Sequence, residues 1–372
     1  MYSPADLEFM QLALDEARKA SFISNPNPRV GCVIVKDNQV IGHGHTQMVG
    51  GPHAEVQALA NAKAQGHSVE GATVYVTLEP CCHHGRTPPC TDALINSRVA
   101  KVIAAMEDPY PLVAGKGLQV LKENGIEVRC GLYEKEAADI NPGFIKRIQT
   151  GMPWVRLKIA STLDGTTALN NGVSQWITDN QARLDGHRWR AQACAILTGI
   201  GTIQEDDPQM TVRGIDTPRQ PLRVVIDSQL KISLNAKILE GGNTLVICAN
   251  PDPAHFENMR RELLVHKVAL INLPNEHGKV DLPAVFKYLA QTLQVNEVHV
   301  EAGNKLNGSL IKEDCVDELL MYFAPTLIGP GIGIANLGPF ESLENRYDWQ
   351  FIDQTLIGDD LRLRLTKISA AT

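Results

Sequence analysis

Two short stretches in the first quarter of the chain restrict its fold more than any other feature. Residues 52–56 read Pro-His-Ala-Glu-Val, and residues 78–90 read Leu-Glu-Pro-Cys-Cys-His-His-Gly-Arg-Thr-Pro-Pro-Cys. Together they contain imidazoles, thiols and a carboxylate, which is the inventory of a zinc site with three protein ligands and a fourth position left for water. A chain that builds such a site must bring these two separate segments to one point.

The spacing of the cysteines argues against a zinc finger. Eight residues separate Cys81 from Cys90, whereas finger and ribbon knuckles place roughly two to four residues between paired cysteines. The longer loop allows both thiolates to bind the ion while the segment between them lines a pocket. Cys82 is better explained as a small buried residue. His83 and His84 are alternative ligands, which we expect to face a substrate instead.

The carboxylate of the first stretch gives the site its predicted chemistry. Zinc lowers the pKa of a bound water to about 7, which supplies hydroxide at neutral pH. Glu55 can then take the proton from that water and pass it to a leaving amine. A His-x-Glu segment followed by a Pro-Cys segment is the signature of zinc-dependent nucleobase deaminases. We therefore predict hydrolysis at an amidine-like ring carbon with release of ammonia, and a purely structural zinc site is the alternative.

Length, charge and cysteine use narrow the class of protein. The 372 residues exceed one typical core and predict two domains. A net charge of −7 argues against nucleic acid as the main partner, although a local arginine cluster would still bind a small anion. Outside residues 81–90 the cysteines are scattered singly, as is typical of reduced thiols in a cytoplasm. We see no signal-peptide pattern and no run of roughly 18 apolar residues, so we expect a cytoplasmic location and no membrane partner.

Alternating strand and helix patterns over the first domain predict a layered α/β fold. Apolar residues recur at helical spacing, and β-branched runs mark the strands. We expect helices near residues 4–20, 53–65, 90–95 and 117–124, and strands near 30–35, 40–41, 72–76, 101–105 and 126–129. This assignment puts His53 and Glu55 in the first turn of one helix. It puts Cys90 at the start of another, where the helix dipole favours a thiolate.

The strand and helix patterns of the second half predict another α/β unit. It follows a helical linker over residues 133–145 and a chain break at Gly151-Met152-Pro153. We expect helices near 179–192 and 282–291, strands near 154–160, 195–198, 224–227, 245–249, 298–301 and 319–323, and a closing edge strand near 361–365. The Rossmann fingerprint is absent. Residues 303–309 are expected to form a loop before a helix that starts at Leu310, with backbone N–H groups able to bind a diphosphate. We interpret residues 329–331 as a turn rather than a phosphate loop.

The motifs of the first half resemble those of the bifunctional riboflavin-biosynthesis deaminase/reductase family. The shared segments are His-Ala-Glu, the 78–90 loop and Asn-Pro-x-Val-Gly at residues 27–31. The resemblance implies a cytidine-deaminase-like three-layer domain over residues 1–150 with one zinc ion per chain. It implies zinc ligands His53, Cys81 and Cys90, a proton carrier Glu55, a pyrimidine-ring contact Asn27 and a phosphate contact Arg86.

One position departs from that family. The family usually has a histidine where this chain has Thr46, and His45 stands one residue earlier. Either His45 replaces the substrate contact of the family histidine, or this chain lacks that contact.

The second half resembles the reductase domain of the same family in its segments at 157–165, 174–178, 206–208, 225–228 and 300–303. The resemblance implies a dihydrofolate-reductase-like domain over residues 151–372 that uses NADPH. It implies cofactor contacts at Ala160, Trp176, Thr202, Asp206, Ser228, Gly303, Asn304, Lys305, Leu306, Asn307, Gly308 and Ser309. It implies substrate contacts at Ser174, Arg190, Met210, Arg213 and Glu301, with Lys158 and Asp164 near the chemistry. Both arginines are suited to bidentate binding of a phosphate.

These observations predict a two-domain enzyme that acts on a small phosphorylated pyrimidine. The first domain would deaminate 2,5-diamino-6-(5-phosphoribosylamino)pyrimidin-4-one, and the second would reduce the ribosyl chain of the product to ribityl. We expect a homo-oligomer without nucleic-acid partners. The rivals are a nucleic-acid base-editing deaminase, a zinc-stabilised scaffold without catalysis and a reductase whose deaminase site has decayed.

Overall fold

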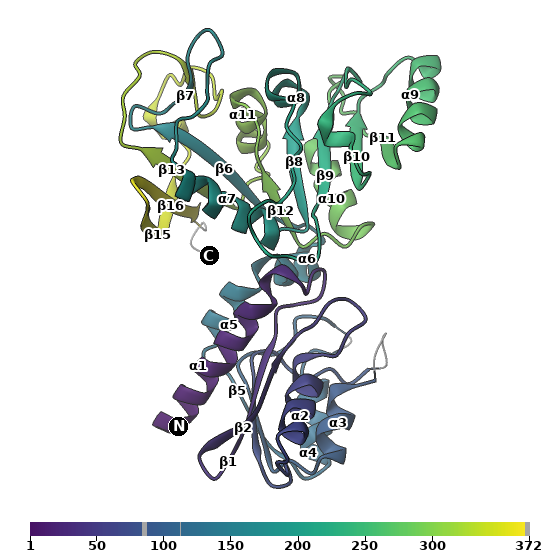
Figure 1. The fold of residues 1–372 in the computed structure, drawn as a ribbon, viewed down its shortest axis with the longest axis vertical. Helices are drawn as coiled ribbons and strands as arrows, with labels where there is room; N and C mark the ends of the chain where they lie inside the picture. Colours follow the sequence, from purple (N-terminus) through teal and green to yellow (C-terminus); the bar gives the residue numbers. More distant parts are fainter. Residues whose placement is uncertain (84–87, 112, 369–372) are drawn as a thin grey trace. The chain divides into compact units, whose positions relative to one another are not determined.

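The computed structural model describes residues 1–83, 88–111 and 113–368. Its contacts divide the chain into two compact units, Met1–Gly151 and Met152–Thr372 (Figure 1). Each unit is α/β, as the strand and helix patterns predicted. Within the described ranges, no helix has the length and apolar character needed to cross a membrane.

The first unit is a five-stranded sheet between two layers of helices (Figure 1). The strands lie in the order β2-β1-β3-β4-β5, with β1 antiparallel to both of its neighbours and β3, β4 and β5 parallel. Helices α1 and α5 lie on one side of the sheet, and α2, α3 and α4 lie on the other. The strands are β1 Gly31–Lys36, β2 Gln39–His45, β3 Thr73–Val76, β4 Lys101–Ala104 and β5 Glu127–Cys130. The helices are α1 Pro4–Lys19, α2 Ala54–Ala64, α3 Cys90–Asn96, α4 Lys116–Glu123, α5 Glu134–Ile140 and α6 Pro142–Thr150.

Glycines in β1 and β2 let the two helical layers approach the sheet closely. A Cβ atom added to Gly31 would lie 2.0 Å from the carbonyl oxygen of Ala13 in α1, and one added to Gly44 would lie 2.6 Å from the nitrogen of Ala58 in α2. Because Gly31 is the register partner of His45, the His45 side chain points to the α1 face. The opposite face of the sheet packs against α2, the helix that follows His53.

The segment expected to link the two domains is part of the first unit. Its helical character is confirmed, but the helix is broken at Asn141 into α5 and α6. The buried Asn141 amide binds the backbone of Arg29 in both directions: Oδ1 accepts from the Arg29 N–H at 2.7 Å and Nδ2 donates to the Arg29 carbonyl at 2.9 Å. These long-range bonds hold the segment against the first sheet, which a periodicity argument could not detect.

The second unit contains a nine-stranded sheet in the order β11-β10-β9-β8-β12-β6-β13-β16-β15. The strands from β11 to β13 are parallel, and β16 and β15 add antiparallel pairs. The strands are β6 Trp154–Thr162, β8 Ala195–Gly199, β9 Leu222–Ile226, β10 Thr244–Cys248, β11 Val268–Asn272, β12 Glu297–Val300, β13 Glu318–Ala324, β15 Trp349–Ile357 and β16 Asp360–Lys367. A small separate pair joins β7 Thr166–Ala168 to β14 Ile332–Gly333.

Helices cover both faces of this sheet. Buried side chains of α10 and α11 share a core with Val155, Leu157 and Val298. The opposite face packs against α8 and α9 through Ile196 and Val225, and against α7 farther along. The helices are α7 Asn180–Gln192, α8 Ile200–Asp206, α9 Pro253–Val265, α10 Leu282–Gln291 and α11 Asn304–Lys312.

The expected edge strand at residues 361–365 is wrong in one respect. These residues form the middle of β16, which lies between β13 and β15, so the edge is β15. The sequence of β15 gave little signal because its side chains are exposed or half-buried along its whole length and a bulge between Phe351 and Asp353 shifts the register. A strand without a buried face lacks the alternation on which sequence assignment depends.

Candidate metal centre and reductase site

The predicted zinc ligands come together in the first unit. His53 precedes α2, Cys81 follows β3 and Cys90 is the first residue of α3. The His53 Nδ1 atom lies 3.6 Å from Cys81 Sγ and 3.3 Å from Cys90 Sγ. The three potential ligand atoms all lie within 4.8 Å of one another.

These distances fit a tetrahedral zinc site. With Zn–S and Zn–N bonds of about 2.3 and 2.05 Å, a sulfur and a nitrogen ligand of a tetrahedral site lie about 3.6 Å apart, and the two distances in the structure are 3.3 and 3.6 Å. One imidazole and two thiols are ligands that zinc prefers. The three residues therefore fit the metal that the sequence predicted.

The expected position of His53 in the first turn of a helix is wrong by one residue. The helix begins at Ala54, and His53 is its N-cap residue with φ −73° and ψ 168°. Side chains two positions apart inside a helix point to different sides. The extended backbone at His53 removes that restriction, so His53 and Glu55 can serve one site.

Glu55 is buried beside the ligands, with 4% of its surface exposed. Burial and, to a lesser extent, the nearby Cys81 thiolate together raise the pKa of its carboxyl to about 7. A hydrogen bond from the Cys90 thiol lowers the pKa of Cys81 to about 4, and the same shared proton raises the pKa of Cys90. Cys81 is thus the more acidic thiol of the pair, and it lies near a carboxyl whose pKa suits proton exchange near neutral pH.

Glu79 is a residue of this site that the sequence interpretation missed. It is buried two positions before Cys81, and its carboxylate accepts four backbone N–H groups. Oε2 accepts from Asp108 and Gly115 at 3.0 and 2.9 Å, and Oε1 accepts from Gly117 and Leu118 at 2.8 and 3.2 Å. Glu79 thus ties the segment that carries Cys81 to the start of α4. A glutamate in a Leu-Glu-Pro motif carries no sequence signal that would reveal these partners.

His45 and Thr46 lie where the family usually has its histidine, and both have hydrogen-bonding partners within the first unit. Thr46 is buried, and its Oγ1 accepts from the Val30 N–H at 3.2 Å. The His45 Nδ1 atom lies 3.1 Å from Glu16 Oε2 of α1, on the sheet face opposite α2. His45 is therefore engaged with α1. Arg86 and His84 lie outside the described residues, and Asn27 is half-buried in a turn where its N–H donates to Ser24 at 2.8 Å.

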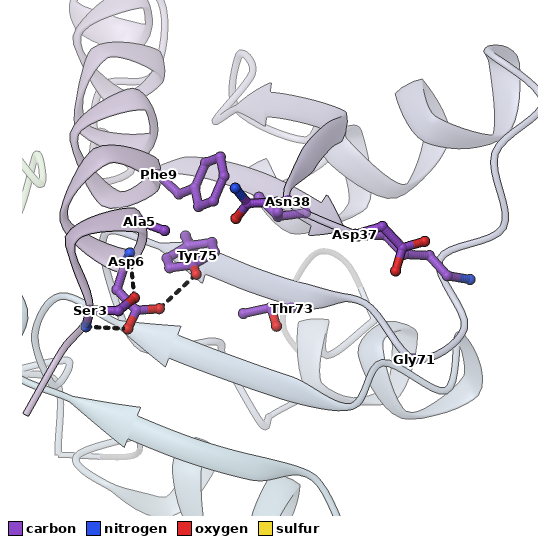
Figure 2. Close-up of a pocket in the computed structure, with 11 residues that line it drawn as sticks. Ser3, Ala5, Asp6, Phe9, Asp37, Asn38, Gly71, Thr73 and Tyr75 are labelled. Carbon is purple, nitrogen blue, oxygen red and sulfur yellow. Dashed lines mark hydrogen bonds between the residues drawn. The ribbon is translucent and has the colours of Figure 1, made fainter.

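A separate pocket of about 290 Å³ lies beside the start of α1 and the β1–β2 turn (Figure 2). Its polar groups bind one another. The Tyr75 hydroxyl donates to Asp6 Oδ1 at 2.8 Å, and the Asp6 carboxylate also accepts from the Ser3 N–H as part of a capping box. None of the predicted site residues lines this pocket, and its hydrogen bonds serve the start of α1.

Three of the predicted substrate contacts meet in the second unit. Arg190 of α7 forms a bidentate ion pair with Glu301, with Nε–Oε1 2.5 Å and Nη2–Oε2 2.9 Å. Its Nη1 donates to the Thr211 carbonyl at 2.9 Å, and Nη2 lies 4.0 Å from the sulfur of Met210. In this structure Glu301 therefore occupies the guanidinium group that the sequence suggested for a phosphate, and the predicted phosphate contact of Arg190 stays a prediction.

Arg213 and His187 lie at the edge of the same cluster. Arg213 is exposed, its Nη1 donates to Thr211 Oγ1 at 3.2 Å, and its backbone N–H donates to His187 Nδ1 at 3.2 Å. Burial and Arg190 lower the pKa of His187 to about 4. Burial also lowers the pKa of Lys158, despite the opposing effect of Glu301. His187 was not predicted, since a lone histidine on an amphipathic helix is unremarkable in sequence.

Several predicted cofactor contacts share one edge of the second sheet. Ala160 lies near the carboxyl end of β6, Thr202 follows β8, Ser228 follows β9 and Gly303 follows β12. These strands are parallel, so their carboxyl ends lie on one side, where ligands of open α/β sheets bind. Trp176 is 71% exposed, with the Arg183 guanidinium 4.5 Å from its ring centroid. Asp206 Oδ1 accepts from the neighbouring Gln175 at 3.4 Å, and Ser174 is half-buried in the same loop.

The expected loop over residues 303–309 is wrong, because α11 begins at Asn304 with Gly303 as its N-cap. The Asn307 N–H already donates to the Gly303 carbonyl at 3.1 Å. A Cβ atom on Gly308 would lie 2.1 Å from the Asn336 carbonyl oxygen, so this glycine permits close packing of two backbone segments. A helix leaves its first four N–H groups without intrahelical partners, and in α11 these are the N–H groups of Gly303 to Leu306.

Two family models match the chain. Residues 3–106 match the cytidine and deoxycytidylate deaminase zinc-binding region, and residues 153–370 match the RibD C-terminal domain. With the His53, Cys81 and Cys90 cluster, these matches define a zinc-dependent deaminase joined to an oxidoreductase. Zinc and NADPH are the cofactors of this pair of domains.

Relatives of similar length match nearly the whole chain. The RibD riboflavin biosynthesis proteins of Escherichia coli K12 and Haemophilus influenzae are 43% and 42% identical, over 97% and 98% of this chain and 99% and 98% of theirs. The structure of Acinetobacter baumannii RibD is 42% identical with a TM-score of 0.89, covering 98% of this chain and 99% of that one. The chain belongs to the RibD family of bifunctional riboflavin biosynthesis enzymes. The predicted family and fold class are confirmed.

Proposed function

We propose that residues 1–150 deaminate 2,5-diamino-6-(5-phosphoribosylamino)pyrimidin-4-one. The observation that carries this proposal is the trio His53, Cys81 and Cys90 at tetrahedral distances with the buried Glu55 beside it. A protein of Thermotoga maritima described as a diaminohydroxyphosphoribosylaminopyrimidine deaminase/5-amino-6-(5-phosphoribosylamino)uracil reductase supports the substrate. Its structure is 30% identical with a TM-score of 0.84, covering 98% of this chain and 99% of that one.

Each residue of the deaminase site has a proposed role. His53, Cys81 and Cys90 hold zinc, which when bound supplies a water acidic enough to lose its proton near neutral pH. Glu55 accepts a proton at its carboxylate and returns it to the departing amine. Its pKa of about 7 suits both steps. Asn27 contacts the pyrimidine ring and Arg86 the 5′-phosphate, as the family resemblance implies.

We propose that residues 151–372 reduce the ribosyl chain of the deaminated product to ribityl with NADPH. Ala160, Thr202 and Ser228 line the cofactor side, and the first turn of α11 binds phosphate through the N–H groups of Gly303, Asn304, Lys305 and Leu306. Trp176 approaches the cofactor from the loop before α7 and Asp206 from the end of α8, while Asn307, Gly308 and Ser309 support the first turn of α11. Hydride transfer depends mainly on placing the nicotinamide over the acceptor carbon.

The substrate side of the reductase is proposed to contain Ser174, Arg190, Met210, Arg213 and Glu301. Arg213 makes the first contact with the phosphate because it is exposed, whereas Arg190 is paired with Glu301. Arg190 joins the phosphate after it releases Glu301.

The chain is further proposed to work in the cytoplasm as a homo-oligomer on small molecules. Its eight cysteines are free thiols, as expected in a reducing compartment. The acidic charge supports a small substrate rather than a nucleic acid.

Replacing Glu55 with Gln tests the deaminase proposal. Ammonia release from the diaminopyrimidine should be abolished, while zinc stays near one per chain. NADPH oxidation with the deaminated product should continue at the wild-type rate. Loss of zinc together with activity would show that Glu55 is a ligand.

Replacing Arg213 with Ala tests the reductase proposal. The KM for the deaminated product should rise, and ammonia release should be unchanged. The matched control is Arg260→Ala, at an exposed arginine of α9. Equal damage to both activities would refute the division of labour between the domains.

A further inference from the structure

His299 is a fully buried histidine without a hydrogen-bond partner in the described part of the chain. It lies on β12 with 0% of its surface exposed, and neither Nδ1 nor Nε2 makes a hydrogen bond there. Most buried side-chain polar groups in proteins are hydrogen-bonded, so an exception requires an explanation. The Nε2 atom lies 3.3 Å from Oε1 of Glu301, which is within ion-pair distance, but the ring N–H is not aligned for a hydrogen bond. Burial lowers the pKa of the ring, and the nearby Glu301 carboxylate opposes that effect.

The position of His299 on β12 directs its ring toward the sheet face where Arg190 and Glu301 form their ion pair. Val298 and Val300 point into the core shared with α10 and α11, so His299 points to the face that α7 covers. Its register partners are Arg156 on β6 and Ile196 on β8. The ring therefore lies close to charged groups: Arg156 is its register partner on β6, and Glu301, two residues along the chain, lies 3.3 Å from Nε2.

The Arg190–Glu301 pair cannot open without a replacement partner for Glu301. Both oxygens of this largely buried carboxylate accept from Arg190, at 2.5 and 2.9 Å. If Arg190 turned to an anionic substrate, the Glu301 carboxylate would lose its main counterion and both of its short hydrogen bonds, and the charge of Lys158 would offset only part of that loss. Leaving one member of a buried ion pair uncompensated is strongly unfavourable.

We infer that His299 is a positioning residue that takes over the Glu301 carboxylate when Arg190 turns to the phosphorylated substrate. The neutral ring donates its Nε2–H to Oε1, which requires only a small movement across the present 3.3 Å. This inference rests on the proposed function, in which Arg190 and Glu301 contact the reductase substrate. His299 accordingly supports substrate binding and touches neither NADPH nor the reacting atoms.

The test compares His299→Leu with His299→Gln in the full-length enzyme. Kinetics are measured with 5-amino-6-(5-phosphoribosylamino)uracil and NADPH. His299→Leu should raise the KM for the pyrimidine about 10-fold, the cost of one unmade hydrogen bond to a charge. The kcat and the KM for NADPH should stay within about 2-fold of wild type. His299→Gln, whose amide N–H can replace the imidazole donor, should keep a KM near wild type.

A merely structural role predicts a different pattern. It would give equal losses for Leu and Gln, or losses in kcat and NADPH binding, and either result overturns the inference. The control is His266→Gln, at an exposed histidine at the end of α9.

A second measurement on the wild-type enzyme does not depend on how the variants fold. With ¹⁵N-labelled histidine, the resonance that is missing from His299→Gln should shift when the pyrimidine is added, as its Nε2–H becomes hydrogen-bonded. An unchanged resonance at saturation overturns the inference.

Arg190→Gln separates this inference from the proposed function. If Arg190→Gln binds the pyrimidine normally, the proposed role of Arg190 is refuted. The inferred replacement of Arg190 by His299 at Glu301 is then refuted as well. If Arg190→Gln binds weakly while His299→Leu binds normally, only the role of His299 is refuted.

Discussion

Replacing Glu79 with Gln should loosen the segment that supports the zinc ligands. The carboxylate accepts two backbone N–H groups at each oxygen, at 3.0 and 2.9 Å for Oε2 and at 2.8 and 3.2 Å for Oε1. Whichever way the Gln amide is turned, its NH₂ group faces two N–H donors and both bonds are lost. A hydrogen bond to a charged group contributes about 1.5–3 kcal/mol. Two such losses predict a local destabilisation of about 3–6 kcal/mol.

Hydrogen exchange measured by mass spectrometry tests this value. Amides of residues 107–111 and 113–118 should exchange about 100-fold faster or more in Glu79→Gln, since each 1.4 kcal/mol corresponds to a factor of ten. The bound zinc should also fall, because Cys81 is two residues away. The matched control is Glu123→Gln, at an exposed glutamate of α4 that pairs only with Gln119 among the described residues. Exchange within about 3-fold of that control would refute the proposed contribution of Glu79.

Three further predictions address metal, pH and backbone. Removing zinc with a chelator should abolish ammonia release and leave NADPH oxidation with the deaminated product intact, as followed by absorbance at the NADPH band. Burial alone would raise the pKa of the Glu318 carboxyl. Arg156 and Arg364 outweigh burial and hold that pKa at about 2, below its ordinary value of 4.5. Its contribution to stability is therefore complete above about pH 4.5 and is lost as the pH falls toward 2. Urea unfolding should show wild type losing its advantage over Glu318→Gln across that range. Tryptophan fluorescence reports this unit, because all four tryptophans follow Met152. Gly186→Ala should stabilise α7 by about 0.5–1 kcal/mol in the same assay, since a Cβ there meets no atom within 4 Å.

The cluster of His53, Cys81 and Cys90 could be predicted because the chemistry needs few residue types and the chain groups them in two segments. Strands with a buried face, such as β1 and β3, could be predicted from their apolar runs. The start of α2 was misplaced by one residue because N-cap and first-turn positions share the same sequence pattern. Only the backbone dihedrals of His53 distinguish them.

The partners of charged side chains could not be predicted. Arg190 and Glu301 are 111 residues apart in the sequence, and nothing local shows that they neutralise one another. The same holds for Glu79, whose four donors belong to residues 108–118. The start of α11 was missed because Asn304 and Gly308 are poor helix formers. Packing of Gly308 against the Asn336 backbone outweighs that propensity.

The Arg190–Glu301 pair also bears on how an acidic enzyme binds an anionic substrate. With a net charge of −7, the chain as a whole repels a phosphate at long range, so binding depends on local positive groups. An unpaired buried arginine would be costly in the empty enzyme. Pairing Arg190 with Glu301 avoids that cost, and in the proposed reductase site the exposed Arg213 is left to make the first contact. If Arg190 then joins the phosphate as proposed, the affinity for substrate depends on what replaces Arg190 at Glu301, and the buried His299 lies 3.3 Å from that carboxylate. Without substrate, the buried imidazole of His299 lacks a hydrogen bond, which is unfavourable. The inferred bond to Glu301 in the substrate complex would explain why a histidine occupies this position.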